Sequence, residues 1–211
     1  MNALIVLGGD RPDGALLERC MQESDLTIAA DSGLSAFDAL GLMPDLLVGD
    51  MDSVDPAVLA RYEGCLPEHR LNCIKDDTDG VDALDLAIAR GADEITLLGA
   101  LGGRLDHAMA NLMLLVRAHR RGASAQILDR SVCILRVDGE TVLRGAKGDT
   151  VSFLPLGEAY GVTLKGFFYP LRDATLKSDY PLGVSNVVTQ EEAVAQVKRG
   201  DLLMFHYRGT L

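Results

Sequence analysis

The first 130 residues alternate short, largely apolar runs with stretches in which apolar residues recur every three or four positions. The short runs lie at 3–7, 26–30, 46–48, 71–74, 95–98 and 125–128. A run that is apolar nearly throughout is typical of a strand buried on both faces of a parallel sheet. The alternation of such strands with helical stretches predicts a doubly wound, mainly parallel α/β domain.

Three of the helical stretches carry start and stop signals. Asp55 followed by Pro56 predicts an N-cap and a first helical residue, and Gly64 predicts the end of that helix. A second helix, ending at Gly91, is predicted from an apolar face made by Val81, Leu84, Ala87 and Ile88. The longest apolar stripe predicts a third helix, ending before Gly122, whose buried face carries Leu105, Ala108, Met109, Leu112 and Val116.

The pattern changes after residue 130. Short β-rich runs at 132–137, 140–143, 150–154, 161–164 and 202–207 are separated by Gly, Pro and Asp, and 191–198 is the one segment that could form a helix. Such spacing favours a small antiparallel β-sandwich or barrel. The sequence therefore predicts an α/β domain over 1–130 followed by a β-sandwich domain over 131–211.

Charge is divided unevenly between the two predicted domains. Residues 1–130 hold 22 acidic against 11 basic side chains, whereas 131–211 hold nine of each, so the first domain carries the whole net charge of −11. A surface of this sign repels a phosphate backbone, which argues against nucleic-acid binding. A small polyphosphate that arrives with a divalent cation is still allowed.

Two further features concern the compartment. No apolar run approaches the ~18 residues of a membrane-spanning helix, and the apolar start at 3–7 is interpreted as a first strand rather than a signal peptide. The four cysteines include no Cys-x-x-Cys pair, so we expect free thiols and a cytoplasmic location.

Aspartates gather where the predicted strands of the first domain end. They are Asp10, Asp31, Asp50, Asp52, Asp76, Asp77, Asp79 and Asp106. Open α/β sheets bind ligands at the carboxyl ends of their strands, and carboxylates crowded there repel one another unless a cation joins them. Mg²⁺ bridging a polyphosphate is the common solution, and the Gly102-Gly103 turn lets backbone N–H groups approach a phosphate beside Arg104.

Each of these motifs has a plainer interpretation. Asp31, Asp55 and Asp79 could serve only as helix caps, the pair Asp50 and Asp52 could be solvated turn residues, and Gly102-Gly103 could serve only a tight connection. The chain contains neither a P-loop motif nor a Gly-x-Gly-x-x-Gly after its first strand, which excludes the ordinary P-loop kinases and dinucleotide-binding domains.

Several motifs in series resemble the signature of the thiamine pyrophosphokinases. They are Ala30-Asp31-Ser32-Gly33, Pro44-Asp45-Leu46-Leu47-Val48-Gly49-Asp50-Met51-Asp52-Ser53, Asp76-Asp77-Thr78-Asp79, Gly102-Gly103-Arg104-Leu105-Asp106-His107, Gly148-Asp149, Phe153-Leu154-Pro155-Leu156-Gly157, Tyr169-Pro170-Leu171 and Ser185-Asn186. The resemblance covers nearly the whole chain. It implies an α/β catalytic domain, a β-sandwich, and transfer of diphosphate from Mg-ATP to the hydroxyl of thiamine.

The resemblance also implies roles for particular residues. Mg²⁺ would be held by Asp50, Asp52 and Asp79, and these would form the catalytic set with Arg104 and Asp106. The nucleotide and diphosphate would be contacted by Asp31, Ser53, Lys75, Thr78, Gly102, Gly103 and His107. Tyr169, Ser185 and Asn186 would contact thiamine, with Tyr169 offering an aromatic face to its cationic ring. The family's members are homodimers in which thiamine binds between one subunit's catalytic domain and its partner's β-domain.

Two other functions are compatible with the residues. A glycosyl- or nucleotidyltransferase could use Asp50 and Asp52 as a metal-binding Asp-x-Asp pair, and would ignore thiamine. A thiamine or nucleotide sensor on the same scaffold would bind ligand without releasing AMP. Tyr169 could also be an ordinary core aromatic residue.

Overall fold

The computed structural model describes residues 1–70 and 78–209 of the chain, with no side-chain detail at 68–70. The strand predicted at 71–74 therefore lies outside the described residues. Tertiary contacts divide the chain into two compact units, Met1–Arg130 and Ser131–Leu211. Among the described residues, no helix has both the length and the apolar character needed to cross a membrane.

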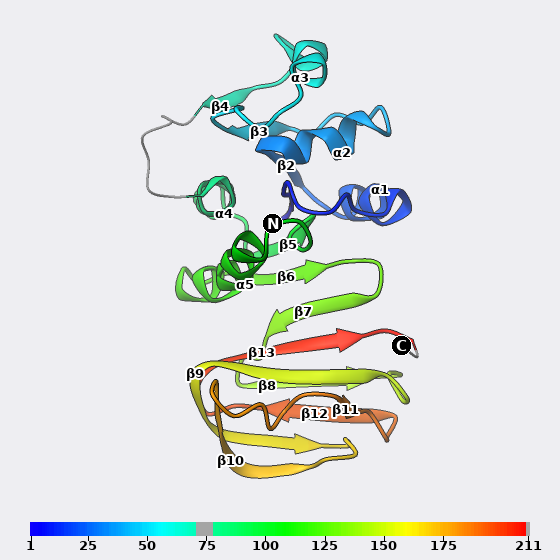
Figure 1. Ribbon diagram of the computed structural model, residues 1–211, viewed down its shortest axis with the longest axis vertical. Coiled ribbons are helices and arrows are strands. Elements are labelled where there is room, and N and C mark those ends of the chain that lie inside the picture. The colour runs from blue at the N-terminus through cyan, green and yellow to red at the C-terminus, as the bar shows by residue number, and fades with distance from the viewer. Residues whose placement is uncertain (71–77, 210–211) are drawn as a thin grey trace. The chain divides into compact units, whose positions relative to one another are not determined.

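Unit 1 is built on a six-stranded sheet (Figure 1). Its strands, in spatial order, are β4 (Glu68–Arg70), β3 (Leu46–Gly49), β2 (Leu26–Ala30), β1 (Asn2–Val6), β5 (Glu94–Leu98) and β6 (Ser124–Leu128). All neighbours are parallel, with Val6 of β1 opposite Ala29 on one side and Leu98 on the other. The predicted parallel sheet is confirmed. The direction of strand order reverses between β1 and β5, which is where open α/β sheets bind ligands.

The helices of unit 1 are α1 (Gly14–Gln22), the 3₁₀ turn η1 (Asp31–Gly33), α2 (Leu34–Asp38), α3 (Pro56–Tyr62), α4 (Asp79–Ala89) and α5 (Leu105–Arg120). The three predicted helices are α3, α4 and α5, whereas α1 and α2 were not predicted. The cap at Asp55 is confirmed, because its side chain accepts a hydrogen bond from Ala57 N at 2.8 Å. Thr78, not Asp79, caps α4, accepting from Val81 N at 3.4 Å.

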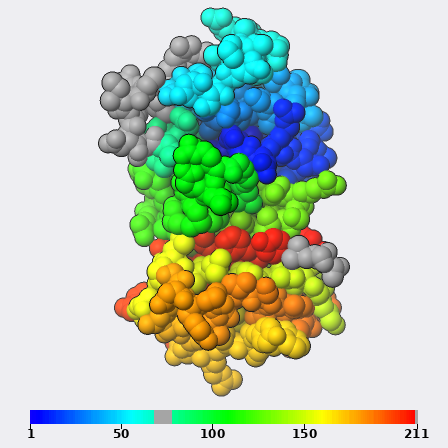
Figure 2. All heavy atoms as spheres, viewed as in Figure 1, coloured from blue at the N-terminus to red at the C-terminus, as the bar shows by residue number. Residues whose placement is uncertain are grey.

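The buried face predicted for α5 is wrong in part. Leu105 and Met109 are 83% and 52% exposed, and Met113, one turn further, is 40% exposed. The buried face instead carries Leu114, Leu115, Val116 and Ala118, and α5 packs on β6 and α4. This helix has apolar residues on two sides, so the most regular stripe in its sequence is not the side that meets the sheet. The α5 segment lies at the surface in Figure 2.

Unit 2 is antiparallel throughout. Its strands are β7 (Val132–Arg136), β8 (Glu140–Arg144), β9 (Thr150–Lys165), β10 (Leu171–Lys177), β11 (Asn186–Val187), β12 (Glu192–Gln196) and β13 (Arg199–Tyr207). The first part of β9 pairs with β13, which also pairs with β7. The second part of β9 pairs with β10 and β12, and β12 pairs with β8. The long strand β9 thus joins both groups of strands, and the predicted β-rich second part is confirmed.

The core of unit 2 lies between these strands. Phe153 and Phe167 meet edge to face there, with ring centroids 5.3 Å apart. The helix considered at 191–198 is wrong. The segment forms β12. Ala193 and Ala195 are buried, whereas Glu192, Val194 and Gln196 are more exposed, and this alternation is the period of two of a strand. The runs predicted at 150–154 and 161–164 are parts of one strand, β9, and β10 and β11 were not predicted.

Candidate active site

The carboxyl ends of the strands in unit 1 surround a cavity of about 460 Å³. Its walls come from the segments that follow β1, β2, β3 and β5 and from the N-terminal parts of α4 and α5. The lining residues are Leu7, Gly8, Gly9, Ala30, Asp31, Ser32, Ser53, Thr78, Asp79, Gly80, Ala100, Gly102, Gly103, Arg104, His107, Ala110 and Asn111. This size suits a small organic ligand.

Three carboxylates meet beside this cavity. Each of Asp31, Asp50 and Asp52 offers an oxygen, and these oxygens lie within 4.8 Å of one another. Asp31 is 8% exposed, and its Oδ1 has no hydrogen-bond partner among the described residues. Burial raises the pKa of Asp31 above its ordinary value, with Asp52 and Asp50 adding smaller repulsions. The sequence placed Asp31 with the nucleotide, whereas its position groups it with the two aspartates expected to hold metal.

The backbone around these carboxylates is held in an uncommon conformation. Asp31 and Met51 have φ values of 47° and 65°, in the left-handed region that side-chain-bearing residues seldom adopt. Such conformations persist only where the surrounding structure enforces them, and they cluster at functional sites. Asp52 N donates to Asp50 Oδ1 at 3.2 Å, and Ser53 Oγ donates to Asp52 Oδ1 at 2.8 Å. The turn is therefore organised by the carboxylates it presents.

Asp79 faces the same cluster from the start of α4. A Cβ atom on Gly49 would lie 3.2 Å from both Asp31 Cβ and Asp79 Oδ1, so a side chain at this position, where φ is 141°, would crowd both aspartates. Burial raises the pKa of Asp79 to about 6, and repulsion from Asp31, Asp50 and Asp52 adds to it. Four carboxylates are therefore electrostatically coupled at one edge of the sheet.

This donor set fits a magnesium ion. Mg²⁺ prefers oxygen ligands and is held by a few carboxylates together with substrate phosphates. Crowded carboxylates, one of them with a buried oxygen that has no partner in the described part of the chain, repel one another until a cation joins them. Asp31, Asp50, Asp52 and Asp79 are the residues that could hold it.

Another part of the cavity lining offers backbone donors and the side chain of Arg104. Within the described residues no side chain caps the N-terminus of α5, and Gly102 and Gly103 before it have φ values of 82° and 60°. The N–H groups at such a helix start attract phosphate. Arg104 beside them is 72% exposed on its side chain, which leaves its guanidinium accessible to an anion.

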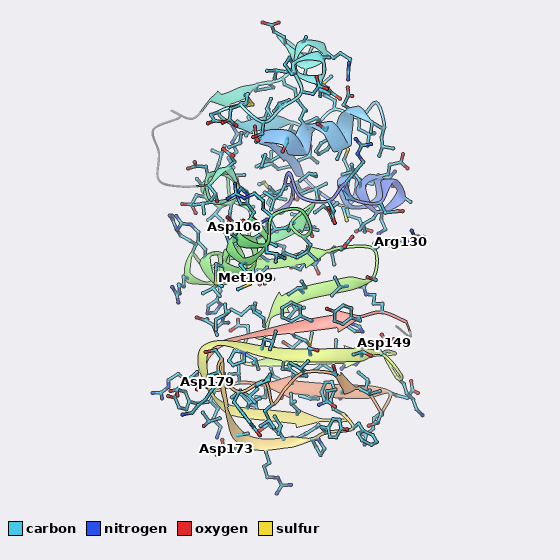
Figure 3. The ribbon with its side chains drawn as sticks, viewed as in Figure 1. Asp106, Met109, Arg130, Asp149, Asp173 and Asp179 are labelled. Atoms are coloured by element: carbon cyan, nitrogen blue, oxygen red, sulfur yellow. The ribbon has the colours of Figure 1, made fainter. Side chains whose placement is uncertain are left out.

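Arg104 is paired with Asp106 across one turn. Its Nε donates to Asp106 Oδ1 at 3.1 Å and its Nη2 to Oδ2 at 2.5 Å, and His107 N donates to Oδ1 at 3.1 Å. These contacts lower the pKa of Asp106 to about 2, chiefly through the Arg104 hydrogen bond. Figure 3 labels Asp106 and Met109 on the same helix. Asp106 orients Arg104 and is a weak base.

Nine residues that line the cavity were not among the predicted site residues: Leu7, Gly8, Gly9, Ala30, Ser32, Gly80, Ala100, Ala110 and Asn111. Asn111 Nδ2 donates to Ala100 O at 2.8 Å, which fixes the amide. Its spacing of four from His107 places both on one side of α5, and that spacing could have identified it. Gly9 is required by close approach, because a Cβ there would be 2.3 Å from Leu101 O.

The remaining predicted residues belong to unit 2 or to the undescribed segment. Asn186 is buried, and its Nδ2 donates to Tyr169 O at 2.8 Å while its Oδ1 accepts from Tyr169 N at 2.9 Å. Tyr169 is 60% exposed, which excludes the core-aromatic interpretation, and it meets Phe168 edge to face at 4.9 Å. Ser185 N donates to Ser152 Oγ at 3.0 Å. Lys75 lies outside the described residues.

Comparison with known proteins agrees with this arrangement. Residues 17–127 match the model of the thiamin pyrophosphokinase catalytic domain, and residues 134–201 match that of the thiamin pyrophosphokinase vitamin B1 binding domain. The thiamine pyrophosphokinase of Bacillus subtilis strain 168 is 30% identical over 207 residues, or 95% of each chain.

Solved structures of thiamine pyrophosphokinases are similar to this chain over its full length. The crystal structure of thiamine pyrophosphokinase from Bacillus subtilis superposes with a TM-score of 0.86 at 26% identity and covers 100% of both chains. That of thiamin pyrophosphokinase from Geobacillus thermodenitrificans gives 0.83 at 27% identity, covering 100% of this chain and 99% of that one. The chain belongs to the thiamine pyrophosphokinase family.

Proposed function

We propose that this chain transfers the diphosphate group of Mg-ATP to the hydroxyl of thiamine, giving thiamine diphosphate and AMP. The observation that carries the proposal is the cavity of unit 1, which is bordered both by four coupled carboxylates and by the start of α5 with Arg104. A polyphosphate needs both: a cation site for its charge and backbone donors for its oxygens.

We assign the magnesium site to Asp50, Asp52 and Asp79, and add Asp31. The bound cation would supply charge neutralisation for the triphosphate and a fixed orientation for it. Asp31 strengthens the assignment because its Oδ1 is buried without a partner in the described chain. Asp79 strengthens it because burial, together with repulsion from Asp31, Asp50 and Asp52, raises its pKa to about 6, and a cation would remove the repulsive part.

We assign the triphosphate to the segments facing these carboxylates. Gly102, Gly103 and Arg104 would hold phosphate oxygens through backbone N–H groups and the guanidinium. Ser53, Thr78 and His107 line the same cavity and would contact the nucleotide. Lys75 stays a sequence-based assignment for the nucleotide.

The chemistry then depends mainly on position. The thiamine hydroxyl oxygen attacks the β-phosphorus, a new P–O bond forms, and the bond from that phosphorus to the oxygen of the α-phosphate breaks to release AMP. The hydroxyl proton passes to a base. Asp106 is a poor acceptor because Arg104 holds its pKa at about 2. Asp79 is the other carboxylate considered for this step, and it can accept the proton only while it does not ligate the cation.

We assign thiamine to Tyr169, Ser185 and Asn186 of unit 2. Tyr169 offers an exposed ring to the cationic thiazolium. Asn186 acts through Tyr169, because its amide is bonded to both backbone groups of that residue. Ser185 is held in a left-handed conformation with φ of 57° directly before Asn186.

We further propose a homodimer with the active site completed by the partner subunit. Exposed large apolar side chains support this. On α5 they are Leu105, Met109 and Met113, and in unit 2 they are Phe168, Tyr169, Tyr180, Leu182 and Val184. The three on α5 recur every four residues and so share one side of the helix, and exposed apolar surface of this kind marks an interaction site. Leu105 follows Arg104 directly, so the first of these surfaces adjoins the cavity.

Product analysis tests the reaction. Purified protein is incubated with ATP, Mg²⁺ and thiamine, and nucleotides and thiamine esters are separated by chromatography. Equal amounts of AMP and thiamine diphosphate, both lost with EDTA, without thiamine, or in Asp50→Asn, are expected. ADP with thiamine monophosphate would contradict the group transferred. Thiamine binding without AMP would indicate a sensor, and turnover of nucleotide sugars would indicate an Asp-x-Asp transferase.

Complementation tests the shared site. Asp50→Asn and Tyr169→Ala are each expected to be nearly inactive alone. When both are expressed together, about half of the dimers are mixed and each holds one intact site, so activity should return to about a quarter of the wild-type value. A mixture that stays inactive while dimers form would contradict a site shared between subunits.

A further inference from the structure

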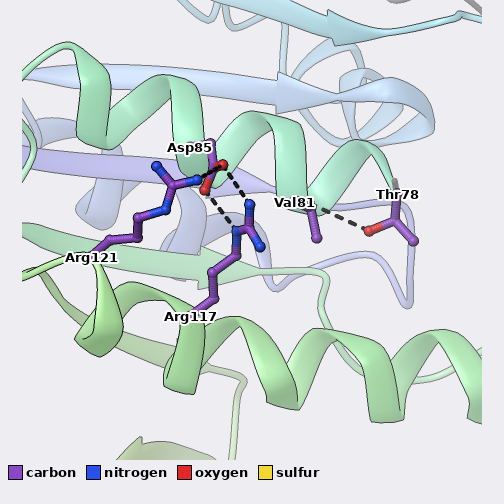
Figure 4. A network of polar contacts seen from close by, with 5 residues as sticks. All are labelled: Thr78, Val81, Asp85, Arg117 and Arg121. Carbon is purple, nitrogen blue, oxygen red and sulfur yellow. Dashed lines mark hydrogen bonds and ion pairs between the residues drawn. The ribbon is translucent and has the colours of Figure 1, made fainter. Parts of the chain in front are cut away.

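Helices α4 and α5 are joined at two places along their length. Gly80, at the N-terminus of α4, lies against the middle of α5, and a Cβ atom added there would be 3.3 Å from Leu114 Cδ1 and 3.5 Å from Asn111 Oδ1. Further along, Asp85 of α4 lies between Arg117 and Arg121 of α5 (Figure 4). Two separate contacts fix the spacing and the angle between two helices, whereas one contact alone leaves them free to pivot.

In the second contact, Asp85 forms a bidentate ion pair with Arg117 and a further hydrogen bond with Arg121, and we call the bidentate pair the fork. Arg117 Nε donates to Asp85 Oδ1 at 2.8 Å and Arg117 Nη2 to Asp85 Oδ2 at 2.6 Å, and Arg121 Nη2 donates to Oδ2 at 2.5 Å. The Asp85 side chain is only 26% exposed. The Arg117 hydrogen bond is the main cause that lowers the pKa of Asp85, so the carboxylate is charged at neutral pH. Bidentate pairing of this kind restricts both distance and orientation.

Both helices direct their N-terminal residues to the same cavity. Asp79 and Gly80 of α4 line it, as do His107 and Asn111 of α5. Asp85 lies six residues after Asp79, and Arg117 lies ten residues after His107. At a rise of 1.5 Å per residue these separations are about 9 Å and about 15 Å along the two helices. The fork is therefore too far back to touch substrate and close enough to control how the two helix starts face each other.

We propose that Asp85, held by Arg117 and Arg121, is a positioning residue for diphosphate transfer. It keeps α4 and α5 at the separation at which Asp79 and the segment from Arg104 to His107 act on one bound Mg-ATP. The inference rests on the proposed function, since it names what that site needs from residues outside it. Misplacement of reacting groups by about 1 Å can lower a rate about 100-fold, even when the altered residue is remote.

A graded series of variants tests the proposal. Arg121→Ala leaves the bidentate fork intact and should change kcat less than about 3-fold. Arg117→Ala and Asp85→Ala remove the fork and should lower kcat about 10- to 100-fold, with KM for thiamine within about 3-fold of the wild-type value. Arg117→Lys keeps the charge without the fork and should recover part of the loss.

A matched control separates positioning from stability. Asp201 in unit 2 is 20% exposed and accepts from Arg136 Nε at 2.8 Å, so Asp201→Asn also removes the negative charge from a half-buried Arg–Asp ion pair. It should lower the thermal midpoint and leave kcat at the wild-type value. If Asp85→Ala behaves in the same way, with a lower midpoint and normal kcat, the positioning role is wrong. If Asp85→Ala does not fold, the order Arg121→Ala, Arg117→Lys, Arg117→Ala decides, and equal kcat in all three would overturn the proposal.

Calorimetric titration with Mg-ATP in the absence of thiamine tests the positioning role of Asp85 independently of the proposed reaction. If wild-type protein forms no AMP and no thiamine diphosphate, the proposed function fails. The helix positions are still tested, because Asp85→Ala should then bind Mg-ATP about 10-fold more weakly than the wild-type chain or Asp201→Asn. Equal affinity in all three proteins would overturn the positioning role.

Discussion

Replacing Asp79 with asparagine should make the protein more stable at neutral pH without divalent cations, although it removes a proposed magnesium ligand. The reason is the crowding of carboxylates around this residue. Burial and repulsion from Asp31, Asp50 and Asp52 raise the pKa of Asp79 from 3.8 to about 6. Between these two values the folded protein keeps a proton on Asp79 that the unfolded chain has lost, so stability falls as pH rises from about 4 to about 6.

The size of the effect follows from the pKa shift. A shift of one unit corresponds to about 1.36 kcal/mol, which would give about 3 kcal/mol for a fully buried group. Asp79 is only partly buried, so solvent screening reduces this to about 1–2 kcal/mol. For a chain of 211 residues this corresponds to a rise of about 2–8 °C in the thermal midpoint of Asp79→Asn at pH 7.5.

Thermal unfolding followed by circular dichroism in EDTA, from pH 4 to pH 8, measures the effect. Wild-type protein and Asp79→Asn should have similar midpoints near pH 4 and separate as pH rises through 6. Saturating Mg²⁺ should raise the wild-type midpoint more than that of the variant, because the cation binds the folded state. Asp106→Asn is the control: its pKa is lowered by Arg104, so its removal should not stabilise the protein.

A midpoint of Asp79→Asn at or below the wild-type value at pH 7.5 in EDTA would refute the reasoning. It would mean that Asp79 is not in repulsive contact with its neighbours when no cation is bound. A stabilisation that is equally large at pH 4 would also refute it, because both proteins are neutral at this position there.

Three further predictions concern residues that act through packing or orientation. Asn186→Ala should lower the unfolding free energy by about 1–3 kcal/mol and raise KM for thiamine, since it leaves backbone groups of Tyr169 without partners; unchanged KM in steady-state assays would contradict this. Gly9→Ala should abolish Mg-ATP binding measured by calorimetry, because its Cβ would lie 2.3 Å from Leu101 O and 2.4 Å from Gly99 O, and normal affinity would contradict the close approach. Asn111→Ala should weaken Mg-ATP binding about 10-fold with little change in thermal midpoint, and equal affinity would remove Asn111 from the nucleotide site.

The sheet of unit 1 could be predicted because its strands are buried on both faces and so read as apolar runs. Val6, Ala29 and Leu98 are each within 2% of full burial and lie opposite one another. The buried face of α5 was predicted wrongly because this helix has apolar residues on two sides. Periodicity detects a stripe such as Leu105 and Met109, but it does not say whether the sheet or another surface covers it.

The site could be predicted in its residue types more fully than in its grouping. The sequence shows that Asp50 and Asp52 follow one strand and that Asp31 follows another. Because parallel strands end at one edge of a sheet, it could be predicted that these residues lie at the same edge. The grouping of Asp31 with these two could not be predicted, since it depends on η1 and on the left-handed conformation at Asp31 itself. Asn111 was missed because it lies two turns inside a helix, where sequence shows no motif boundary.

The fork at Asp85 opposes the repulsion among the carboxylates of the site. Repulsion among Asp31, Asp50 and Asp79 acts to push the start of α4 away from the ends of β2 and β3 whenever no cation is bound. Contacts that resist this movement must lie outside the cavity, because a residue inside it would compete with substrate. Asp85, bonded to Arg117 and Arg121, meets that requirement by holding α4 against α5. The site can therefore stay assembled for its ligand while its own charges oppose assembly, which is how a destabilising active site is tolerated within a marginally stable fold.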